Sequence, residues 1–416
     1  MERILVRGGG PLSGRVAISG AKNSVLKLMA ATVLAEGTFT IRNVPNITDV
    51  RLMAELLEAM GCTATLDGSV LTVVRPSEIT PEAPYELVEA MRASIVVLGP
   101  LLAREGRARV SLPGGDDFGS RPIDMHLKGL EALGATLTTR HGYVEGVADG
   151  GLVGTRIVLE YPSVGATENV MMAAVLAEGQ TVIENAAKEP ELADLAAFLN
   201  RMGASIIGAG SSTVTVDGVE ELHPVDHTVI ADRLEAATFL TGLAVAGGEL
   251  VLEGARPEHM DMLMHKMGDM GMRTSSHPDG VWASAPERIR GVDINSLPYP
   301  GIATDYLPLM VAALSVADGP AIATENIFGG RFRYVDELVR MGADIRVEHH
   351  YALIRGVPRL SGAPVRAHDI RAGAAIAMAA LGADGETVIS EAHHVARGYD
   401  RFVEKLRAIG ADVDAD

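Results

Sequence analysis

The chain repeats one pattern of about 70 residues six times. A glycine followed by a short β-like run recurs at Gly37, Gly106, Gly179, Gly248, Gly319 and Gly385. A second marker, a large apolar residue followed by glycine, recurs at Gly61, Gly134, Gly203, Gly271, Gly342 and Gly410. Two independent markers with one period indicate six copies of a single supersecondary unit.

Each copy predicts the same order of elements. A helix that is apolar nearly all round comes first, as in residues 22–37, and a glycine and a strand follow it. A loop and an amphipathic helix come next, as in residues 48–61, where leucine and methionine recur at helical spacing. The glycine after that helix matches a C-terminal cap. Two strands close the unit, and Asp67-Gly68 is a hairpin signal between them.

The apolar helices determine the expected architecture. A helix that is apolar on every side must be buried on every side, so we expect these helices in the middle, with strands and amphipathic helices outside them. Six units exceed a single core, and three per domain is the natural division. The sequence therefore predicts an α/β fold of two inside-out α/β domains, each with three βαβαββ units around buried central helices.

The two ends of the chain indicate how the copies are completed. The sixth copy stops at residue 416 without its second strand, while residues 3–9 form a strand with no helix before it. We expect this strand to complete the sixth copy. The predicted domains are residues 22–230, which carry a mobile loop at 111–122, and residues 1–21 plus 231–416. Two chain crossings would join them, and the cleft between them would hold the active site.

Charge and composition exclude several classes of function. The formal net charge is −18, which disfavours nucleic-acid or membrane-surface partners. The single cysteine, Cys62, permits no internal disulfide and is expected in the core. The start lacks the apolar segment of a signal peptide, and no uncharged apolar run approaches the roughly 20 residues of a membrane helix. We expect a cytoplasmic protein.

Polar residues fall at equivalent places in the copies. The starts of the buried helices, which attract anions through free N–H groups, carry Lys22, Asn23, Arg92, Ser163, Val164, Gly165, Asp232, Arg233, Thr304, Asp305, Asp369 and Arg371. The loops after the glycine-led strands carry Arg121, Lys188, Glu189, Arg331 and Arg397. These places lie at the same end of each unit. Six cations gathered in one cleft would suit a substrate with several phosphates or carboxylates, namely Lys22, Arg92, Arg121, Arg331, Arg371 and Arg397.

Plainer interpretations remain open for individual residues. A lone lysine or arginine is usually a solvated surface charge. Asp305 and Asp369 could be helix N-caps, and Asp116 and Asp117 could be turn residues. The glycines around that last pair favour a loop that moves. The histidine pairs at residues 349–350 and 393–394 are expected in turns at the surface rather than as metal ligands.

Several of these segments together resemble a known family. They include residues 19–37 (SGAKNSVLKLMAATVLAEG), 111–135 (SLPGGDDFGSRPIDMHLKGLEALGA) and 163–179 (SVGATENVMMAAVLAEG). Residues 92–104, 183–191, 324–332 and 369–373 add to them. The chain resembles the UDP-N-acetylglucosamine enolpyruvyl transferases from about residue 5 to residue 411, and the segment 111–126 is the most specific. The related shikimate-pathway enzyme shares the six-unit fold, but that segment is not typical of it.

The resemblance implies a reaction and its site. The family transfers the enolpyruvyl group of phosphoenolpyruvate to the 3-hydroxyl of UDP-N-acetylglucosamine and releases phosphate, at the start of cell-wall precursor synthesis. It implies no metal or organic cofactor. It implies phosphoenolpyruvate contacts at Lys22, Asn23, Arg121 and Arg397. It implies UDP-sugar contacts at Arg92, Arg121, Pro122, Ile123, Asp124, Met125, Ser163, Val164, Gly165, Asp305 and Ile327, with Arg331 and Arg371 lining the cleft.

Roles for the catalytic residues follow from this resemblance. The expected catalytic groups are Lys22, Asp116, Asp305 and Arg397, with Asp116 as the acid that protonates the vinyl carbon and Asp305 as the base for the hydroxyl. Many family members have cysteine where this chain has Asp116. A carboxyl with an ordinary pKa of about 3.9 is ionised at neutral pH, so Asp116 needs a raised pKa when the loop closes.

Three departures from the family pattern leave alternatives open. Ala396 stands where many members have aspartate, Gly329 replaces a common glutamate, and residues 300–305 read PGIATD in place of PGFPTD. The alternatives are enolpyruvyl transfer to another uridine nucleotide in secondary metabolism, or a UDP-sugar-binding regulator without turnover.

Overall fold

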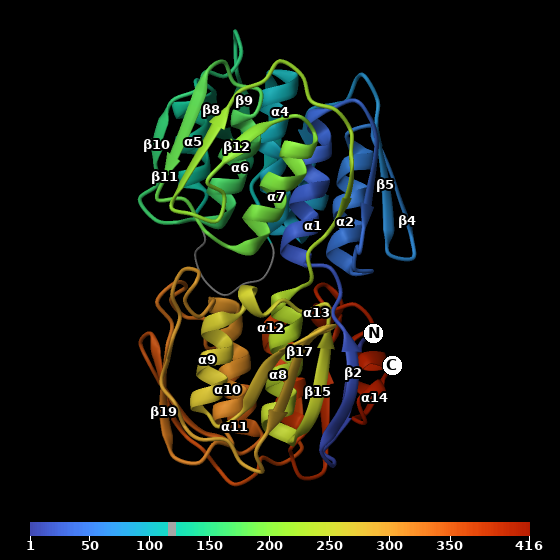
Figure 1. Cartoon of the computed structure of the whole chain (residues 1–416), viewed down its shortest axis with the longest axis vertical. Helices are drawn as coiled ribbons and strands as arrows, with labels where there is room; N and C mark the ends of the chain where they lie inside the picture. Colours follow the sequence, from blue (N-terminus) through green and yellow to red (C-terminus); the bar gives the residue numbers. More distant parts are fainter. Residues whose placement is uncertain (115–121) are drawn as a thin grey trace. The chain divides into compact units, whose positions relative to one another are not determined.

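The computed structural model describes residues 1–114 and 122–416. Asp116, Asp117 and Arg121 lie outside these residues. The described chain forms two compact units, one with residues 20–114 and 122–230 and the other with residues 1–19 and 231–416. We call them the 20–230 unit and the 231–416 unit. Figure 1 colours the first from blue to yellow-green and most of the second from yellow to red.

The 20–230 unit contains three four-stranded sheets with one repeated topology. In each sheet the first two strands are parallel and the other neighbours are antiparallel. Parallel strands cannot be joined by a tight turn and need a crossover connection, whereas consecutive antiparallel strands can be joined by a short turn. In spatial order the sheets are β14 (Asp226–Thr228), β3 (Gly37–Arg42), β5 (Val70–Arg75), β4 (Thr63–Asp67); β6 (Glu82–Ala83), β7 (Arg107–Ser111), β9 (Tyr143–Val147), β8 (Thr136–Arg140); and β10 (Arg156–Val158), β11 (Gln180–Glu184), β13 (Thr213–Asp217), β12 (Ser205–Ile207).

The 231–416 unit repeats this arrangement, and the start of the chain supplies two of its strands. Its sheets are β2 (Leu12–Ala17), β15 (Gly248–Glu253), β17 (Gly280–Ala285), β16 (Arg273–His277); β18 (Ile294–Asn295), β19 (Pro320–Thr324), β21 (Tyr351–Arg355), β20 (Asp344–Glu348); and β22 (Pro364–Arg366), β23 (Glu386–Ser390), β1 (Arg3–Arg7), β24 (Asp412–Ala415). β1 pairs with β23 and β24, so the N-terminal strand completes the sixth copy as predicted.

Two strands are exchanged relative to a simple repeat. β2 directly precedes the first central helix, but it pairs in parallel with β15 of the fourth copy. β14 directly precedes the fourth central helix, but it pairs in parallel with β3 of the first copy. Each strand therefore stays in the unit that the chain is about to leave. The periodicity alone did not indicate this exchange.

The helices that open each copy are buried, as their composition predicts. The 20–230 unit has α1 (Lys22–Ala31), extended by the 3-10 turn η1 (Thr32–Leu34); η2 (Arg92–Val97) continuing into α4 (Leu98–Glu105); and α6 (Val164–Ala174). The 231–416 unit has α8 (Arg233–Ala246); η4 (Thr304–Tyr306) continuing into α10 (Leu307–Leu314); and α12 (Ile370–Ala380). These helices and sheets confirm the predicted α/β class with buried central helices.

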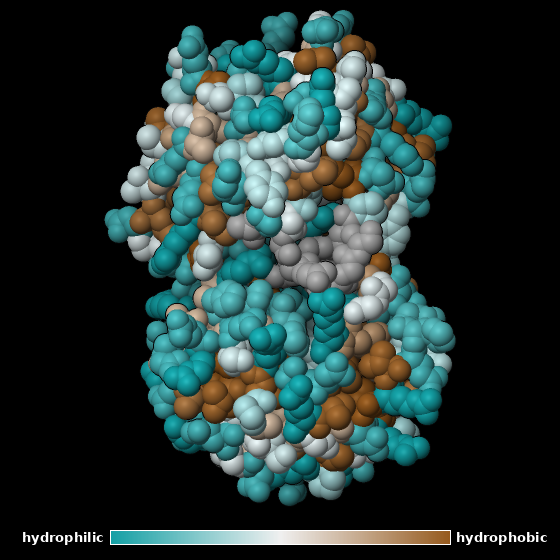
Figure 2. Space-filling view, turned by 180° about the vertical axis from the view of Figure 1, so that it is seen from behind, coloured by the Kyte–Doolittle hydropathy of each residue, from teal (hydrophilic) through white to brown (hydrophobic). Residues whose placement is uncertain are grey.

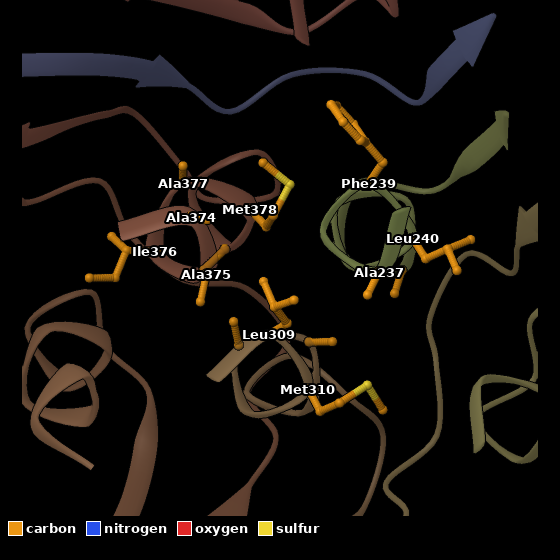
Figure 3. Close-up of a cluster of buried hydrophobic side chains, with 14 of the residues drawn as sticks. Ala237, Phe239, Leu240, Leu309, Met310, Ala374, Ala375, Ile376, Ala377 and Met378 are labelled. Carbon is orange, nitrogen blue, oxygen red and sulfur yellow. The ribbon is translucent and has the colours of Figure 1, made fainter. Parts of the chain in front are cut away.

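Small side chains let the central helices approach one another. Figure 3 shows the three central helices of the 231–416 unit packed side by side, with Ala237, Phe239 and Leu240 on α8, Leu309 and Met310 on α10, and Ala374, Ala375, Ile376, Ala377 and Met378 on α12. A Cβ on Gly242 of α8 would lie 2.7 Å from Sδ of Met378, so only glycine fits there without displacing a neighbour. The alanine-rich composition of these segments is therefore a packing requirement.

The outer helices end as the sequence predicts. They are α2 (Thr48–Ala59), α5 (Asp124–Ala132), α7 (Pro190–Arg201), α9 (Asp261–Asp269), α11 (Arg333–Arg340) and α14 (Phe402–Ala408). The glycine after each has a φ between 93° and 110°. The next amide bonds the carbonyl five residues earlier, as from Cys62 to Leu57 at 3.0 Å. This geometry defines a glycine cap with a left-handed residue.

Three short helices complete the described elements and bring one correction. They are α3 (Tyr85–Ala90), η3 (Pro257–His259) and α13 (His393–Ala396). His349 and His350 lie in a turn as predicted, but the prediction for His393 and His394 is wrong, because both form the first residues of α13. Cys62 is buried as predicted, and burial raises the pKa of its thiol to about 11.

In the part of the chain that the structure describes, no helix is both long and apolar enough to span a membrane. The face seen in Figure 2 carries hydrophilic residues around separate groups of hydrophobic ones.

Candidate active site

The start of α1 holds an ion pair that the sequence did not predict. Lys22 is the first residue of the helix, and its Nζ lies 2.9 Å from Oδ2 of Asp49 in the first turn of α2. The Asp49 side chain is 1% exposed and that of Lys22 is 13% exposed. Ala21, the N-cap residue, has no side-chain acceptor. An anion at this helix start would meet the helix dipole together with an ammonium group whose position Asp49 holds.

The start of α6 carries a second set of candidate residues. Ser163 is the N-cap, and its Oγ accepts the amide of Ala166 at 3.3 Å. Val164 and Gly165 form the first turn. A Cβ on Gly165 would lie 2.9 Å from Cε1 of His126, so glycine lets the imidazole approach the helix end. This turn is a second place where backbone amides and the helix dipole favour an anion.

His126 is a neutral hydrogen-bond donor at this place. Asn169 accepts the amide of Gly99 at its Oδ1, so its Nδ2 donates to the carbonyl of Ile95 and to Nδ1 of His126 at 3.1 Å. The imidazole proton therefore sits on Nε2. Burial, together with the positive charge of Arg92, lowers the pKa of His126 to about 4. At neutral pH the ring can donate a hydrogen bond without carrying charge.

The segment before α5 lies beside Arg92. Nη2 of Arg92 donates to the carbonyl of Pro122 at 3.4 Å. Ile123 and Met125 are half-buried and pack against the core of the 20–230 unit. The Asp124 carboxylate is about half exposed and lies 3.8 Å from Nζ of Lys128. The structure therefore brings Arg92 and Pro122 together and leaves the carboxylate of Asp124 accessible.

In the 231–416 unit, two buried arginines hold the carboxylate of Asp305. Nη1 of Arg331 lies 2.8 Å from Oδ1, and Nε of Arg371 lies 3.3 Å from Oδ2. The arginine side chains are 3% and 4% exposed, whereas the Asp305 side chain is 25% exposed. Burial opposes the charge of Arg331, but the nearby Asp305 and Asp369 raise its pKa above the ordinary value. The two guanidinium groups therefore orient the carboxylate, which stays partly exposed to solvent.

Glu325 fixes the residues around this carboxylate. Its Oε2 accepts the hydroxyl of Thr304 at 2.6 Å, and Thr304 Oγ1 in turn accepts Nη1 of Arg331 at 2.9 Å. Its Oε1 accepts the amides of Ile327 and Phe328 at 2.7 and 3.1 Å. One buried carboxylate thus links η4, which carries Asp305, to the loop that carries Ile327.

Tyr399 supports Arg371 from the other side. Nη1 of Arg371 donates to the Tyr399 hydroxyl at 2.9 Å. That hydroxyl lies 2.8 Å from Oγ1 of Thr238, whose own proton goes to the carbonyl of Leu234, so Tyr399 donates to Thr238. Burial raises the pKa of Tyr399, so its proton stays in place. The chain of donors leaves little freedom for the guanidinium that holds Asp305.

Asp305 and Asp369 could both have been helix N-caps, and the structure shows that only Asp369 is one. Asp369 is an N-cap, and its Oδ1 accepts the amides of Arg371 and Ala372. For Asp305 that interpretation is wrong, because Ala303 is the N-cap of η4 and the carboxylate faces the two arginines. Arg397 follows α13, is half-buried and belongs to the same unit. Asp116 and Arg121, the proposed acid and its neighbour, lie outside the described residues.

Asp49, His126, Glu325 and Tyr399 were not among the site residues predicted from the sequence. Asp49 stands in the first turn of an amphipathic helix, where an acidic residue is ordinary. His126 ends the motif that was judged most specific, so its position was a usable signal. Glu325 and Tyr399 act through Thr304 and Arg371, and no local pattern distinguishes them from other buried polar residues.

Comparisons with known proteins agree with this fold. The family model described as EPSP synthase (3-phosphoshikimate 1-carboxyvinyltransferase) matches residues 6–406. The crystal structure of the enolpyruvyl transferase NikO from Streptomyces tendae has a TM-score of 0.88 at 28% identity, and the match covers 99% of this chain and 98% of that one. An EPSP synthase from Acinetobacter baumannii has a TM-score of 0.76 at 18% identity, which supports the fold alone. The family model, which covers nearly the whole chain, and the fold show that the chain is an enolpyruvyl transferase.

Curated relatives narrow the class further. A UDP-N-acetylglucosamine 1-carboxyvinyltransferase of Mycolicibacterium paratuberculosis is 51% identical over 413 residues, which is 99% of both chains. Proteins of that name from Nocardia farcinica and Trichlorobacter lovleyi are 51% and 47% identical, over 99% of this chain in each case. The chain belongs to the UDP-N-acetylglucosamine 1-carboxyvinyltransferases, a branch of the enolpyruvyl transferase family.

Proposed function

We propose that the chain transfers the enolpyruvyl group of phosphoenolpyruvate to the 3-hydroxyl of UDP-N-acetylglucosamine and releases inorganic phosphate. This is the first committed step of peptidoglycan precursor synthesis, which serves cell shape and division, and we place it in the cytoplasm. The observation that carries the proposal is the Asp305 carboxylate, oriented by two buried arginines in a chain about half identical to enzymes named for this reaction.

The two substrates would be bound by different groups of residues. At the start of α1, Lys22 and Asn23 would bind the phosphate and carboxylate of phosphoenolpyruvate, with Arg121 and Arg397. Arg92, the segment Pro122–Met125 and the turn Ser163–Gly165 would hold the UDP-sugar, with Ile327. His126 adds an uncharged donor for the diphosphate. We propose that both sets serve one reaction.

The addition step moves two protons. The Asp116 carboxyl gives its proton to the vinyl carbon while the sugar oxygen bonds to the neighbouring carbon, and Asp305 takes the hydroxyl proton. Arg331 and Arg371 hold the Asp305 carboxylate in place, and the hydroxyl becomes acidic enough to give up its proton as the C–O bond forms. The intermediate then loses phosphate and a methyl proton and yields the enolpyruvyl ether. Closure of loop 111–122 would exclude water.

One assay tests the function against its alternatives. Phosphate release from phosphoenolpyruvate is measured with UDP-N-acetylglucosamine, UMP, shikimate 3-phosphate or no acceptor. We expect release only with the sugar nucleotide. Release with UMP alone would favour another uridine acceptor, and UDP-sugar binding without release would favour a regulator. The identity of 51% to the named transferase against 28% to NikO favours the main proposal.

Asp116 gives the proposal a sharp test. Asp116→Asn should lose most turnover and keep UDP-sugar binding, because an amide cannot donate the proton, whereas Asp116→Cys should stay active. We also propose resistance to fosfomycin, an epoxide that alkylates the cysteine of the common family form. Nanomolar-to-micromolar inhibition of the unmodified enzyme would refute the resistance, and an inactive Asp116→Cys enzyme would refute the equivalence of the two residues.

A further inference from the structure

A second buried ion pair lies deeper in the 20–230 unit, below the start of α1. Nζ of Lys27 lies 3.5 Å from Oε2 of Glu168 on α6 and donates to the carbonyl of Asn23 at 2.8 Å. The Glu168 side chain is 1% exposed and that of Lys27 is 11% exposed. Within the described residues, neither carboxylate oxygen of Glu168 accepts a hydrogen bond of normal geometry. A carboxylate that is buried and poorly hydrogen-bonded gains little from staying ionised.

Burial and the surrounding charges bring the pKa of Glu168 close to neutral pH, so its carboxyl changes protonation there. Burial raises the pKa of Glu168 to about 7, Lys27 opposes this rise, and Glu191 and Glu189 add to it. Lys27 in turn helps to lower the pKa of His126, so its charge is felt at the start of α6. Within the described residues, the charged groups that act on Glu168 are Lys27 of α1 and Glu189 and Glu191 at and beside the start of α7. On the other side, Lys27 and Arg92 of η2 both act on His126 of α5.

We propose that the Lys27–Glu168 pair sets the affinity of this enzyme for its anionic substrates, because protonation of Glu168 leaves the Lys27 charge uncompensated beneath the starts of α1 and α6. This inference rests on the proposed function. When Glu168 is ionised, the pair is neutral and the anion sites depend on their own donors. When Glu168 is protonated, one buried positive charge strengthens anion binding, since Coulomb interactions are weakly screened inside a protein.

Binding of UDP-N-acetylglucosamine measured between pH 6 and pH 8 tests the proposal. The diphosphate diester of this ligand does not titrate in that range, so a change belongs to the protein. For the unmodified enzyme we expect the Kd to rise about three- to tenfold from pH 6 to pH 8. Glu168→Gln should bind at all pH values as tightly as the unmodified enzyme does at pH 6. Lys27→Met should bind at all pH values as weakly as the unmodified enzyme does at pH 8.

A control variant distinguishes an effect of Glu168 on substrate affinity from a general loss of stability. Glu105 of the same unit pairs with the buried Arg75, so Glu105→Gln also removes the acid of a largely buried pair. It should retain the pH dependence of the unmodified enzyme. If Glu168→Gln fails to fold, calorimetry of the unmodified enzyme in two buffers of different ionisation enthalpy should still detect uptake of a few tenths of a proton on binding near pH 7.

The outcomes distinguish the two proposals. Parallel pH curves for the unmodified enzyme, Glu168→Gln and Lys27→Met, or binding without proton uptake, would overturn the role of the pair and leave the proposed function intact. Absence of UDP-sugar binding at every pH would overturn the proposed function and this inference with it.

Discussion

At the scale of single residues, the site depends on charges that are held by other charges. Asp305 lies between Arg331 and Arg371, and Lys22 is paired with Asp49. Such pairs fix the orientation of a reactive group at the cost of desolvation. Each pair also joins residues of two different elements. A substitution that removes one member therefore tests what that member contributes to the site.

Removal of the Asp305 charge should separate binding from turnover. We expect Asp305→Asn to lower kcat by roughly a hundred- to ten-thousandfold, because an amide cannot accept the hydroxyl proton. The Kd for UDP-N-acetylglucosamine should change only a few-fold, since the other sugar contacts remain. Steady-state kinetics and calorimetry measure the two effects. The control is Asp226→Asn, which removes an exposed partner of Arg42; equal losses in both variants would contradict the assignment of Asp305 as the base.

Glu168 should also affect how stability depends on pH. Its pKa rises from 4.5 to about 7 in the folded chain. Below pH 4.5 both states hold the proton; between these values only the folded state holds it, so this group lowers stability as pH rises through that window. We expect the Tm of Glu168→Gln relative to the unmodified protein to increase from pH 5 to pH 8. A difference in Tm that is constant with pH would contradict this prediction.

At the scale of elements, the repeated glycine cap is the feature that sequence and structure share most closely. The helix α9 contains a natural comparison, because Gly268 lies within it and Gly271 caps it with a φ of 97°. An L-residue at a positive φ is strained, whereas alanine within a helix is favoured over glycine.

Alanine at these two glycines should therefore have opposite effects. Gly271→Ala should destabilise the protein by about 1 kcal/mol, because of its left-handed backbone. Gly268→Ala should stabilise it by about 0.5–1 kcal/mol, because nothing lies within 4 Å of the added Cβ and the helix gains propensity. Thermal unfolding of both variants measures the two changes in stability. Shifts in Tm of the same sign for the two variants would show that the left-handed backbone at Gly271 does not determine the effect of alanine there.

At the scale of the whole molecule, the exchanged strands determine which parts of the chain can fold alone. The 20–230 unit obtains every strand of its three sheets from its own residues, because β14 lies within it. The other unit needs β1 and β2 from residues 1–19, and β1 lies inside its sheet between β23 and β24. Loss of that strand would leave β24 without a partner and a core face uncovered.

Fragments of the chain can test this topology. Residues 20–230 expressed alone should unfold cooperatively, and residues 231–416 alone should not. Joining residues 1–19 through a flexible linker to the end of 231–416 should restore cooperative unfolding, because Glu2 already bonds Asp416 through its amide at 2.7 Å. Circular dichroism during heating follows all three. A cooperative transition in residues 231–416 without the first 19 would contradict the role of β1 and β2.

The sequence by itself determined the six copies, the buried helices, the glycine caps and the helix starts that carry Lys22, Arg92, Ser163 and Asp305. These features depend on local periodicity and backbone conformation, which each copy repeats. Only the tertiary structure decided the strand exchange, the Lys22–Asp49 and Lys27–Glu168 pairs, and the two arginines around Asp305. Those contacts join residues of different elements, and the Lys27–Glu168 and Asp305–Arg371 contacts also join different copies. Their energies depend on burial and orientation, which residue spacing does not encode.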